Sequence, residues 1–198
     1  MRYTYAIEQA IRAASVLHTG QVRKGPVPYP YLTHVFAVAM IVSDYTDDEN
    51  TIIAALLHDT LSDTDYTSAE LEDDFGGKVK DIVESITEPH YTTDNRKLLL
   101  EERKNFLKKL KDVQEEALIV LAADKVHTMR TVVEEYLEDI SAFVADFGPN
   151  QDDRLFFYQE ISNVLNRRLQ NAILSEFNDV FTEYKNFIHE VKHKTENY

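Results

Sequence analysis

One stretch constrains this chain more than any other: residues 51 to 65, TIIAALLHDTLSDTD, where an apolar run ends in His58 and Asp59. Ile, Ala and Leu fill the positions from 52 to 57, which is the pattern of a helix buried on most of its faces. Burying an imidazole or a carboxylate costs several kcal/mol unless the group is paired or binds a metal ion. His58 and Asp59 are therefore either a satisfied polar pair at a helix end or part of a metal site.

Composition favours a single all-α domain over residues 1–198. The chain has 198 residues, of which 43% are hydrophobic, with only 5 Gly and 5 Pro. It can therefore bury a sizeable core, and it lacks the chain breakers of an all-β protein. Cysteine is absent, so any metal ion must be held by His, Asp and Glu. The lack of disulfides also fits a reducing cytoplasm.

Charge and hydropathy narrow the classes of partner. A formal net charge of −14 opposes the phosphate backbone of nucleic acids, so we expect no general nucleic-acid binding. Binding of a small phosphorylated ligand is still compatible with this charge where a local cluster of cations offsets the negative potential of the protein. The N-terminus has no apolar run of signal-peptide length, and no stretch of about 18 apolar residues predicts a membrane span. We therefore expect a soluble, cytoplasmic protein.

Apolar spacing of three and four residues predicts helices along most of the chain. Thr33 is expected to cap the second helix, and the prolines between 26 and 30 are expected to exclude regular structure from the preceding loop. The last helical region is expected to bend near 171–178. Its apolar residues predict either core packing or the face of a homo-oligomer. The expected helices are 3–18, 33–43, 51–65, 68–75, 78–86, 96–111, 115–143 and 153–192.

Four potential metal ligands come from three apolar helical segments: His34, His58 with Asp59, and Asp124. Each alone is typical of a hydrogen-bonded core residue, and Asp124 has Lys125 or Arg130 as alternative partners. Together, imidazole and carboxylate ligands without thiolates suit a borderline or hard divalent ion. Neighbours on a helix project about 100° apart, so His58 and Asp59 can flank one ion.

Five ordered motifs carry a family resemblance: HTGQVRKG at 18–25, PYLTH at 30–34, AALLHDTLSDT at 54–64, FGGKV at 75–79 and LAADKVHTMR at 121–130. Together they resemble the hydrolase domain of the RelA/SpoT group, within the HD phosphohydrolase superfamily, and its small stand-alone relatives. The resemblance covers about residues 5–165. We expect residues from about 166 to 198 to form a helical C-terminal extension.

The resemblance implies a compact multi-helix HD domain that removes the 3′-pyrophosphate of guanosine tetra- and pentaphosphate with manganese. It implies that His34, His58, Asp59 and Asp124 bind the metal. Ligand chemistry alone also admits iron, zinc, cobalt or nickel. The resemblance further implies a set of residues around the nucleotide: Arg23, Lys24, Lys125, Thr128, Arg154 and Tyr158.

Several of these positions have a purely structural alternative. Arg23 and Lys24 also fit an ordinary solvated loop, and Tyr158 also fits packing. The helix over 96–111 is locally basic and is expected to be mostly a solvated face. The alternative for this helix is that Arg103 or Lys104 supplies a further phosphate contact.

The chain departs from the family after the His-Asp pair, where the family has Glu-Asp and this chain has Ser62 and Asp63. Serine can orient a water molecule but cannot accept its proton near neutral pH. Asp63, or the metal-bound hydroxide, must then suffice. Thr128 replaces the usual Asn of the family. The leading hypothesis is a metal-dependent hydrolase of guanosine tetraphosphate. The alternatives are hydrolysis of another nucleotide or phosphoester, a non-catalytic nucleotide sensor, and a helical scaffold with buried polar pairs.

Overall fold

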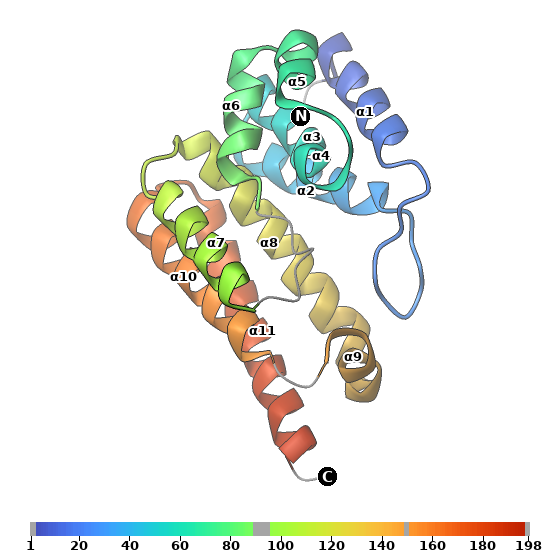
Figure 1. Ribbon diagram of the computed structural model, residues 1–198, viewed down its shortest axis with the longest axis vertical. Coiled ribbons are helices and arrows are strands. Elements are labelled where there is room, and N and C mark those ends of the chain that lie inside the picture. The colour runs from blue at the N-terminus through green and yellow to red at the C-terminus, as the bar shows by residue number, and fades with distance from the viewer. Residues whose placement is uncertain (1–2, 89–95, 149–150, 197–198) are drawn as a thin grey trace.

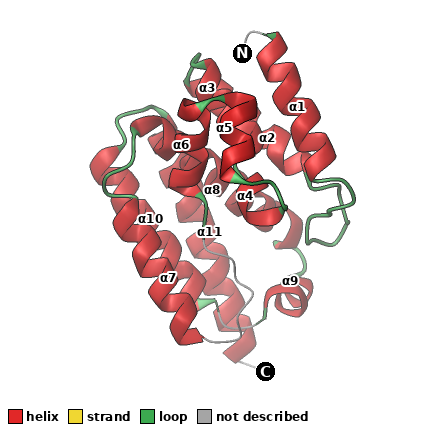
Figure 2. Cartoon of the chain, turned by 45° about the horizontal axis from the view of Figure 1, so that its top comes forward, coloured by secondary structure: helices red, strands yellow, loops and turns green. Residues whose placement is uncertain are grey.

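The computed structural model describes residues 3–88, 96–148 and 151–196, and within them every regular element is an α-helix. Figure 2 shows helices joined by loops, with no strand in the described parts of the chain. The predicted all-α class is confirmed. The helices are α1 Tyr5–Leu17, α2 Leu32–Tyr45, α3 Glu49–Leu57, α4 Thr60–Asp63, α5 Ser68–Phe75, α6 Gly77–Ile86, α7 Arg96–Lys109, α8 Glu115–Tyr136, α9 Ile140–Phe147, α10 Asp152–Arg168 and α11 Ile173–Glu196.

Helix α8 is the axis of the molecule. It runs diagonally through the middle in Figure 1, with α1 to α6 above it and α7, α10 and α11 below it and to its left. It packs against α2, α3, α6 and α11. Every residue from Ala117 to Ala123 is buried, because neighbours cover this part of the helix on all sides. Asp124 therefore emerges from the interior of the protein.

Helix α3 is the second buried element. It lies among α1, α2, α6 and α8, and its residues from Thr51 to Leu57 are all buried. Each fully buried Leu or Ile side chain contributes about 1.5–3 kcal/mol relative to exposure. The expectation that this run is buried on most faces is confirmed. Its interior position brings the following His58 and Asp59 out of bulk water.

The helix expected over 51–65 is interrupted. Helix α3 ends at Leu57, α4 begins at Thr60, and Asp59 between them has φ −99° and ψ 1°. The amide of Asp63 still donates to the carbonyl of Asp59 at 2.9 Å. The turn after Asp59 is therefore kept although the helix axis is broken.

Three other boundaries differ from expectation. The helix expected over 115–143 is split into α8 and α9, because the carboxylate of Asp139 accepts from the amide of Ala142 at 3.0 Å and starts a new helix. Thr33 does not cap α2; its hydroxyl donates to the carbonyl of Pro30 at 2.8 Å. The C-terminal region, expected to bend near 171–178, instead breaks between α10 and α11, where the side chain of Asn171 accepts from the amide of Ile173 at 3.0 Å.

The loop before α2 is more regular than expected. Val22 and Pro30 form an isolated antiparallel bridge. The amide of Arg23 donates to the carbonyl of Tyr29 at 2.8 Å, and that of Tyr31 donates to the carbonyl of Gln21 at 2.9 Å. The prolines do not prevent this pairing because both amide donors belong to other residues. The paired loop leads directly into the first turn of α2.

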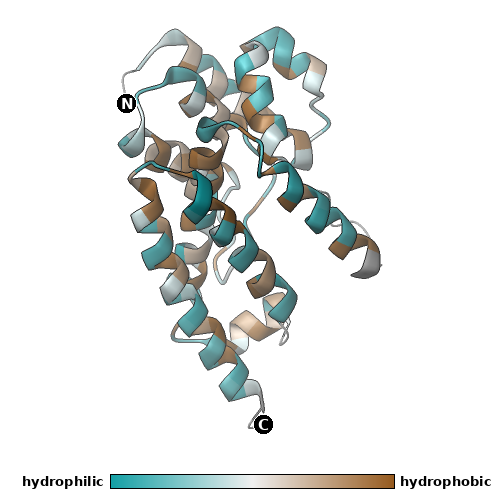
Figure 3. Cartoon of the chain, turned by 90° about the vertical axis from the view of Figure 1, so that its left-hand side faces the viewer, coloured by the Kyte–Doolittle hydropathy of each residue, from teal (hydrophilic) through white to brown (hydrophobic). Residues whose placement is uncertain are grey.

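The apolar face of α11 belongs to the core. Phe177, Phe181, Tyr184 and Ile188 are buried, and α11 packs along α8. In Figure 3 individual helices carry both hydrophobic and hydrophilic residues, the pattern of amphipathic helices. Core packing therefore accounts for this face within a single chain. Among the described residues, no helix combines the length and apolar character needed to span a membrane.

Candidate metal centre

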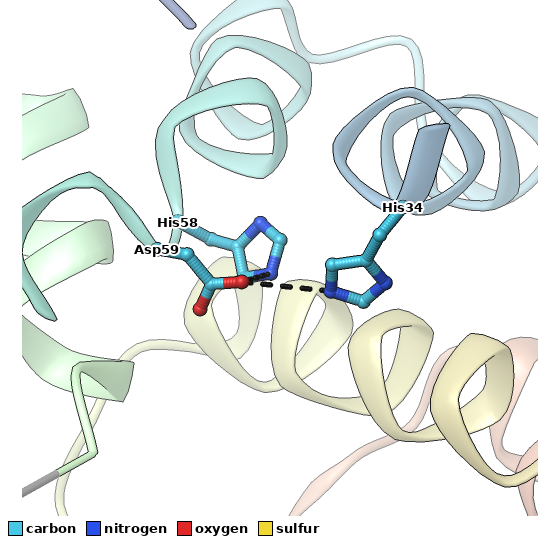
Figure 4. Close-up of side chains that lie close together, drawn as sticks. All are labelled: His34, His58 and Asp59. Atoms are coloured by element: carbon cyan, nitrogen blue, oxygen red, sulfur yellow. Dashed lines mark ion pairs between the residues drawn. The ribbon is translucent and has the colours of Figure 1, made fainter. Parts of the chain in front are cut away.

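Four side chains converge where α2, the α3–α4 joint and α8 meet. His34 lies in the first turn of α2, His58 and Asp59 occupy the joint, and Asp124 lies on α8. Figure 4 shows the rings of His34 and His58 and the carboxylate of Asp59 turned toward one another. Both imidazoles are buried. The predicted ligand positions are thus brought together from three separate elements.

The distances between these side chains fit ligands of one ion. His34 Nε2 lies 3.3 Å from Asp124 Oδ1 and 3.5 Å from Asp59 Oδ2, and His58 Nε2 lies 2.9 Å from the same Asp59 oxygen. The potential ligand atoms of His34, His58 and Asp59 all lie within 4.8 Å of one another. Bonds of about 2.0–2.2 Å to a shared ion place neighbouring ligand atoms about 3 Å apart.

The hydrogen bonding of His58 leaves a nitrogen without a partner. Its Nδ1 lies 2.8 Å from the carbonyl oxygen of Ala55, which can only accept, so Nδ1 carries the hydrogen. Its Nε2 is buried, makes no hydrogen bond with any described residue, and lies 2.9 Å from Asp59 Oδ2. An orphaned imidazole nitrogen beside two carboxylates and a second imidazole fits a divalent transition metal ion.

The electrostatics show that a positive charge is favoured at this point. Burial alone would lower the pKa of His58, but the carboxylates of Asp59 and Asp124 raise it to about 9. Burial opposes ionisation of Asp124 as well, yet Lys125 and the two imidazoles hold its pKa below the ordinary value. In the ion-free protein a proton on His58 supplies the positive charge that a bound cation supplies otherwise.

His127 contacts the candidate ligand His34, and it was not among the residues predicted from the sequence. Its Nδ1 lies 2.8 Å from Nδ1 of His34. When Nε2 of His34 faces the centre with its lone pair, its Nδ1–H donates to His127. Burial and the neighbouring His34 charge lower the pKa of His127 to about 3, so it stays a neutral acceptor. Its place three residues after Asp124, on the same face of α8, was the available signal.

Tyr31 holds the carboxylate of Asp59 and was also missed. Its hydroxyl donates to Asp59 Oδ2 at 2.6 Å. Burial and the Asp59 charge raise the pKa of Tyr31, so its proton stays in place. Tyr31 belongs to the PYLTH motif three residues before His34, so the motif contributes both a candidate ligand and the group that orients another.

Lys125 lies beside the candidate ligand Asp124. Its buried ammonium contacts Asp124 Oδ2 at 2.8 Å and Glu88 Oε1 at 2.5 Å, and it lies 5.7 Å from the centre of the Tyr158 ring. Burial opposes its charge, but the two carboxylates raise its pKa above the ordinary value. Lys125 and Tyr158 therefore meet beside Asp124. Glu88 is an additional partner that the sequence did not indicate.

The residues that depart from the family pattern make short-range contacts. Ser62 donates to the carbonyl of Asp59 at 3.1 Å, and Thr128 lies 3.3 Å from Asp124 Oδ1. The side chain of Asp63 reaches solvent. Partial burial and the charge of Asp59 raise the pKa of Asp63, which makes it a better proton acceptor than an ordinary aspartate.

The remaining cations predicted to bind substrate lie around the periphery. Arg23 lies 5.8 Å from the centre of the Tyr31 ring. It lines a cavity of about 320 Å³ together with Tyr29, Thr33, His127, Thr131, Glu134 and Glu135. The side chain of Lys24 donates to the carbonyl of Asp146 and lies 5.2 Å from the ring of Phe147.

Arg154 also lies against Phe147, 4.9 Å from the centre of its ring. Lys24 and Arg154 thus meet at α9 rather than at the four candidate ligands. On α7, Arg103 donates to the carbonyl of Asp153 at 3.3 Å and lies 4.9 Å from the ring of Phe157, whereas Lys104 is exposed. These contacts fit packing of α7 on α10.

The sequence of this chain is similar to those of known proteins. Residues 10–145 match the family profile described as HD domain. The guanosine-3′,5′-bis(diphosphate) 3′-pyrophosphohydrolase of Haemophilus influenzae is 34% identical over 118 residues, which are 58% of this chain and 17% of that protein. The bifunctional (p)ppGpp synthase/hydrolase SpoT of Escherichia coli K12 is 34% identical over 129 residues, 64% of this chain and 18% of that protein. The chain thus spans less than a fifth of these curated relatives.

Two solved structures share the fold. One is a metazoan ortholog of SpoT, described as hydrolysing ppGpp, with a TM-score of 0.75 and 23% identity over 92% of this chain and 97% of that one. The other, from Listeria monocytogenes EGD-e, has a TM-score of 0.60 and 26% identity over 82% of this chain and 98% of that one. The similarity of fold therefore extends beyond the stretch that the family profile matches.

Proposed function

The chain belongs to the HD-domain family, and from this premise we propose that it is a divalent-metal-dependent phosphohydrolase of small nucleotides. The observation that carries the proposal is the convergence of His34, His58, Asp59 and Asp124, with the orphaned Nε2 of His58 facing the carboxylates. Guanosine-3′,5′-bis(diphosphate) is the proposed substrate, because it is the substrate in the printed name of a curated relative. Manganese is the proposed ion, and the cytoplasm is the proposed location.

When bound, the ion supplies a Lewis acid that polarises phosphate and lowers the pKa of water. His127 and the carbonyl of Ala55 fix the hydrogens of the two ligand imidazoles, so both present a lone pair. Tyr31 orients the carboxylate of Asp59. Asp63 is proposed to accept or relay the proton of the attacking water.

Phosphate binding requires local positive charge, because the chain has a net charge of −14. The proposal assigns the innermost cation to Lys125, whose ammonium is fixed between Asp124 and Glu88. A phosphate oxygen that binds to the Lys125 ammonium replaces part of its contact with the two carboxylates. Arg23 offers a second cation near the ring of Tyr31, with Lys24, Thr128, Arg154 and Tyr158 proposed as outer contacts.

A phosphate-release assay over alarmones, other nucleotides and NADPH, with manganese, iron, zinc, cobalt and nickel in turn, tests the proposal. We expect manganese-dependent pyrophosphate release from guanosine tetraphosphate. Asp59→Ala should abolish both turnover and calorimetric metal binding, whereas Asp73→Ala, an exposed carboxylate on α5, should change neither. Absence of turnover of every phosphate ester, with Asp59→Ala binding metal like the wild type, contradicts the proposal. Turnover of a different nucleotide would retain the enzyme class and replace the substrate.

The second candidate function is a nucleotide sensor that binds without cleaving. The observation in its favour is Ser62, which has no carboxylate and whose hydroxyl is engaged by the carbonyl of Asp59. Tight calorimetric binding of guanosine tetraphosphate without turnover, combined with strong activity in Ser62→Glu, would support the sensor. Efficient wild-type turnover would exclude it.

A further inference from the structure

His18 is a buried histidine beside the metal centre with no assigned role. It follows α1 directly and is 3% exposed. Its ring lies 5.1 Å from the ring of Tyr31, centre to centre, and the hydroxyl of Tyr31 contacts Asp59. One aromatic side chain therefore separates His18 from a candidate metal ligand.

Gln21 determines which nitrogen of His18 carries the hydrogen. The amide nitrogen of Gln21 donates to the backbone carbonyl of Asp63 at 2.7 Å, and a carbonyl oxygen can only accept. This contact fixes the orientation of the Gln21 amide, so its oxygen is the atom 2.8 Å from Nδ1 of His18. Nδ1 must then be the donor, and the lone pair of the neutral ring lies on Nε2.

That lone pair has no partner. Nε2 of His18 is buried and makes no hydrogen bond with any residue that the structure describes. A buried acceptor without a donor destabilises the folded protein. A well-ordered interior does not normally carry such a cost, so the position calls for a donor from outside the chain, such as water.

Asp63 lies within electrostatic reach of the same ring. Burial and the charge of Asp59 raise the pKa of Asp63, whereas a positively charged His18 lowers it. Gln21 and the hydroxyl-bearing Tyr31 also face the His18 ring. The ring thus lies between the HTGQ segment and the turn that carries Ser62, where the family has its additional carboxylate.

We propose that Nε2 of His18 accepts, through a bridging water, the proton of the attacking water, and so replaces the carboxylate missing at Ser62. This inference rests on the proposed hydrolysis. The oxygen of the attacking water bonds to phosphorus as the phosphorus bond to the ribose oxygen breaks. The released proton reaches His18, and Asp63 stabilises the resulting imidazolium. The ribose oxygen takes a proton from solvent, to which His18 later returns its own.

The test uses His18→Asn with guanosine tetraphosphate and manganese. The Asn amide can still donate to Gln21 but has nothing at the position of Nε2, so a purely structural role is preserved. We expect kcat to fall about 10²-fold, with KM, the melting temperature and calorimetric manganese affinity unchanged. His189→Asn, the same change at an exposed site on α11, is the matched control and should match the wild type.

Rescue identifies the role. Ser62→Glu should restore kcat of His18→Asn to within a few fold of the Ser62→Glu single variant, because the new carboxylate replaces His18. If His18→Asn fails to fold, His18→Gln serves instead, since its amide can form hydrogen bonds but cannot accept a proton. Unchanged kcat, or a loss that Ser62→Glu does not restore, overturns this inference and leaves the hydrolase proposal intact. No turnover by the wild type overturns both.

Discussion

The two residue pairs at the α3–α4 joint differ in how firmly the structure holds them. His58 and Asp59 are each fixed by a further group, the carbonyl of Ala55 and the hydroxyl of Tyr31. Ser62 donates to the backbone carbonyl of Asp59, and the side chain of Asp63 is exposed to solvent. We therefore propose that metal binding and proton transfer are separable properties of this short segment. The following predictions test that separation, from the largest expected effect to the smallest.

Loss of a ligand should abolish function. Asp124→Asn removes a carboxylate that contacts both His34 and Lys125. Because a metal ion contributes several kcal/mol of transition-state stabilisation, we expect kcat to fall by about 10³-fold or more, with loss of manganese binding in calorimetry. Asp73→Asn on the exposed side of α5 is the control. Near-normal manganese affinity in Asp124→Asn would remove this residue from the ligand set.

Restoring the family carboxylate should strengthen the weaker pair. Ser62→Glu adds a proton acceptor one turn beyond His58, and we expect kcat to rise by about 10²-fold or more without a change in manganese affinity. Ser62→Gln has nearly the same shape but no basic carboxylate, so it should stay at the wild-type rate. Equal rates in both variants would show that proton transfer does not limit this protein.

The metal-binding pair should also control stability against pH in the ion-free protein. The pKa of His58 is raised from 6.5 to about 9, so its pairing stabilises the fold fully below pH 6.5 and is lost as pH rises through 9. The free energy of unfolding in EDTA should fall by about 3 kcal/mol over this range. Thermal unfolding of wild type and His58→Gln measures it. A variant with the same pH slope as the wild type would contradict the assignment.

Manganese affinity should in turn increase with pH over this range. Metal binding must displace the proton on His58, so a higher pH lowers the cost of that displacement. Calorimetry in buffers of different ionisation enthalpy counts the protons released. Release of a proton at pH 7 is the expected result.

The smallest effect is expected from the support behind the ligands. His127→Phe keeps an aromatic ring but removes the acceptor for Nδ1 of His34. Loss of such an orienting partner typically weakens metal binding by about 10- to 100-fold. Calorimetry with manganese measures the change, with His189→Phe on the exposed face of α11 as the control. Unchanged affinity would mean that packing alone orients His34.

Much of the fold was accessible from the sequence because local pattern determines it. The apolar run before His58 predicts the buried α3, and periodic spacing predicts α1, α6 and the start of α8. The breaks at Asp59 and Asp139 were missed, because periodicity reports which face is buried and not where a side chain begins a new helix. The residue-by-residue roles around the nucleotide stay predictions.

The supporting residues of the site could not be predicted in the same way. His127 meets His34 across 93 positions of sequence, and Tyr31 meets Asp59 across 28. Both lie inside the quoted motifs, so their segments were identified although their contacts were not. Lys24 shows the opposite case. It follows Arg23 directly in sequence, but its side chain contacts Asp146 and Phe147 instead of the candidate ligands.

The hydrogen bonds behind the two imidazoles have a consequence for how such proteins diverge. A descendant of this chain that exchanged His127 or Tyr31 but kept His34, His58, Asp59 and Asp124 would still carry all four candidate metal ligands. It would lose the hydrogen bond that orients the His34 ring or the one that orients the Asp59 carboxylate. Such a chain would keep the four candidate ligands while losing the activity that depends on their orientation. Tracing the activity through a lineage therefore requires following the residues that never touch the ion.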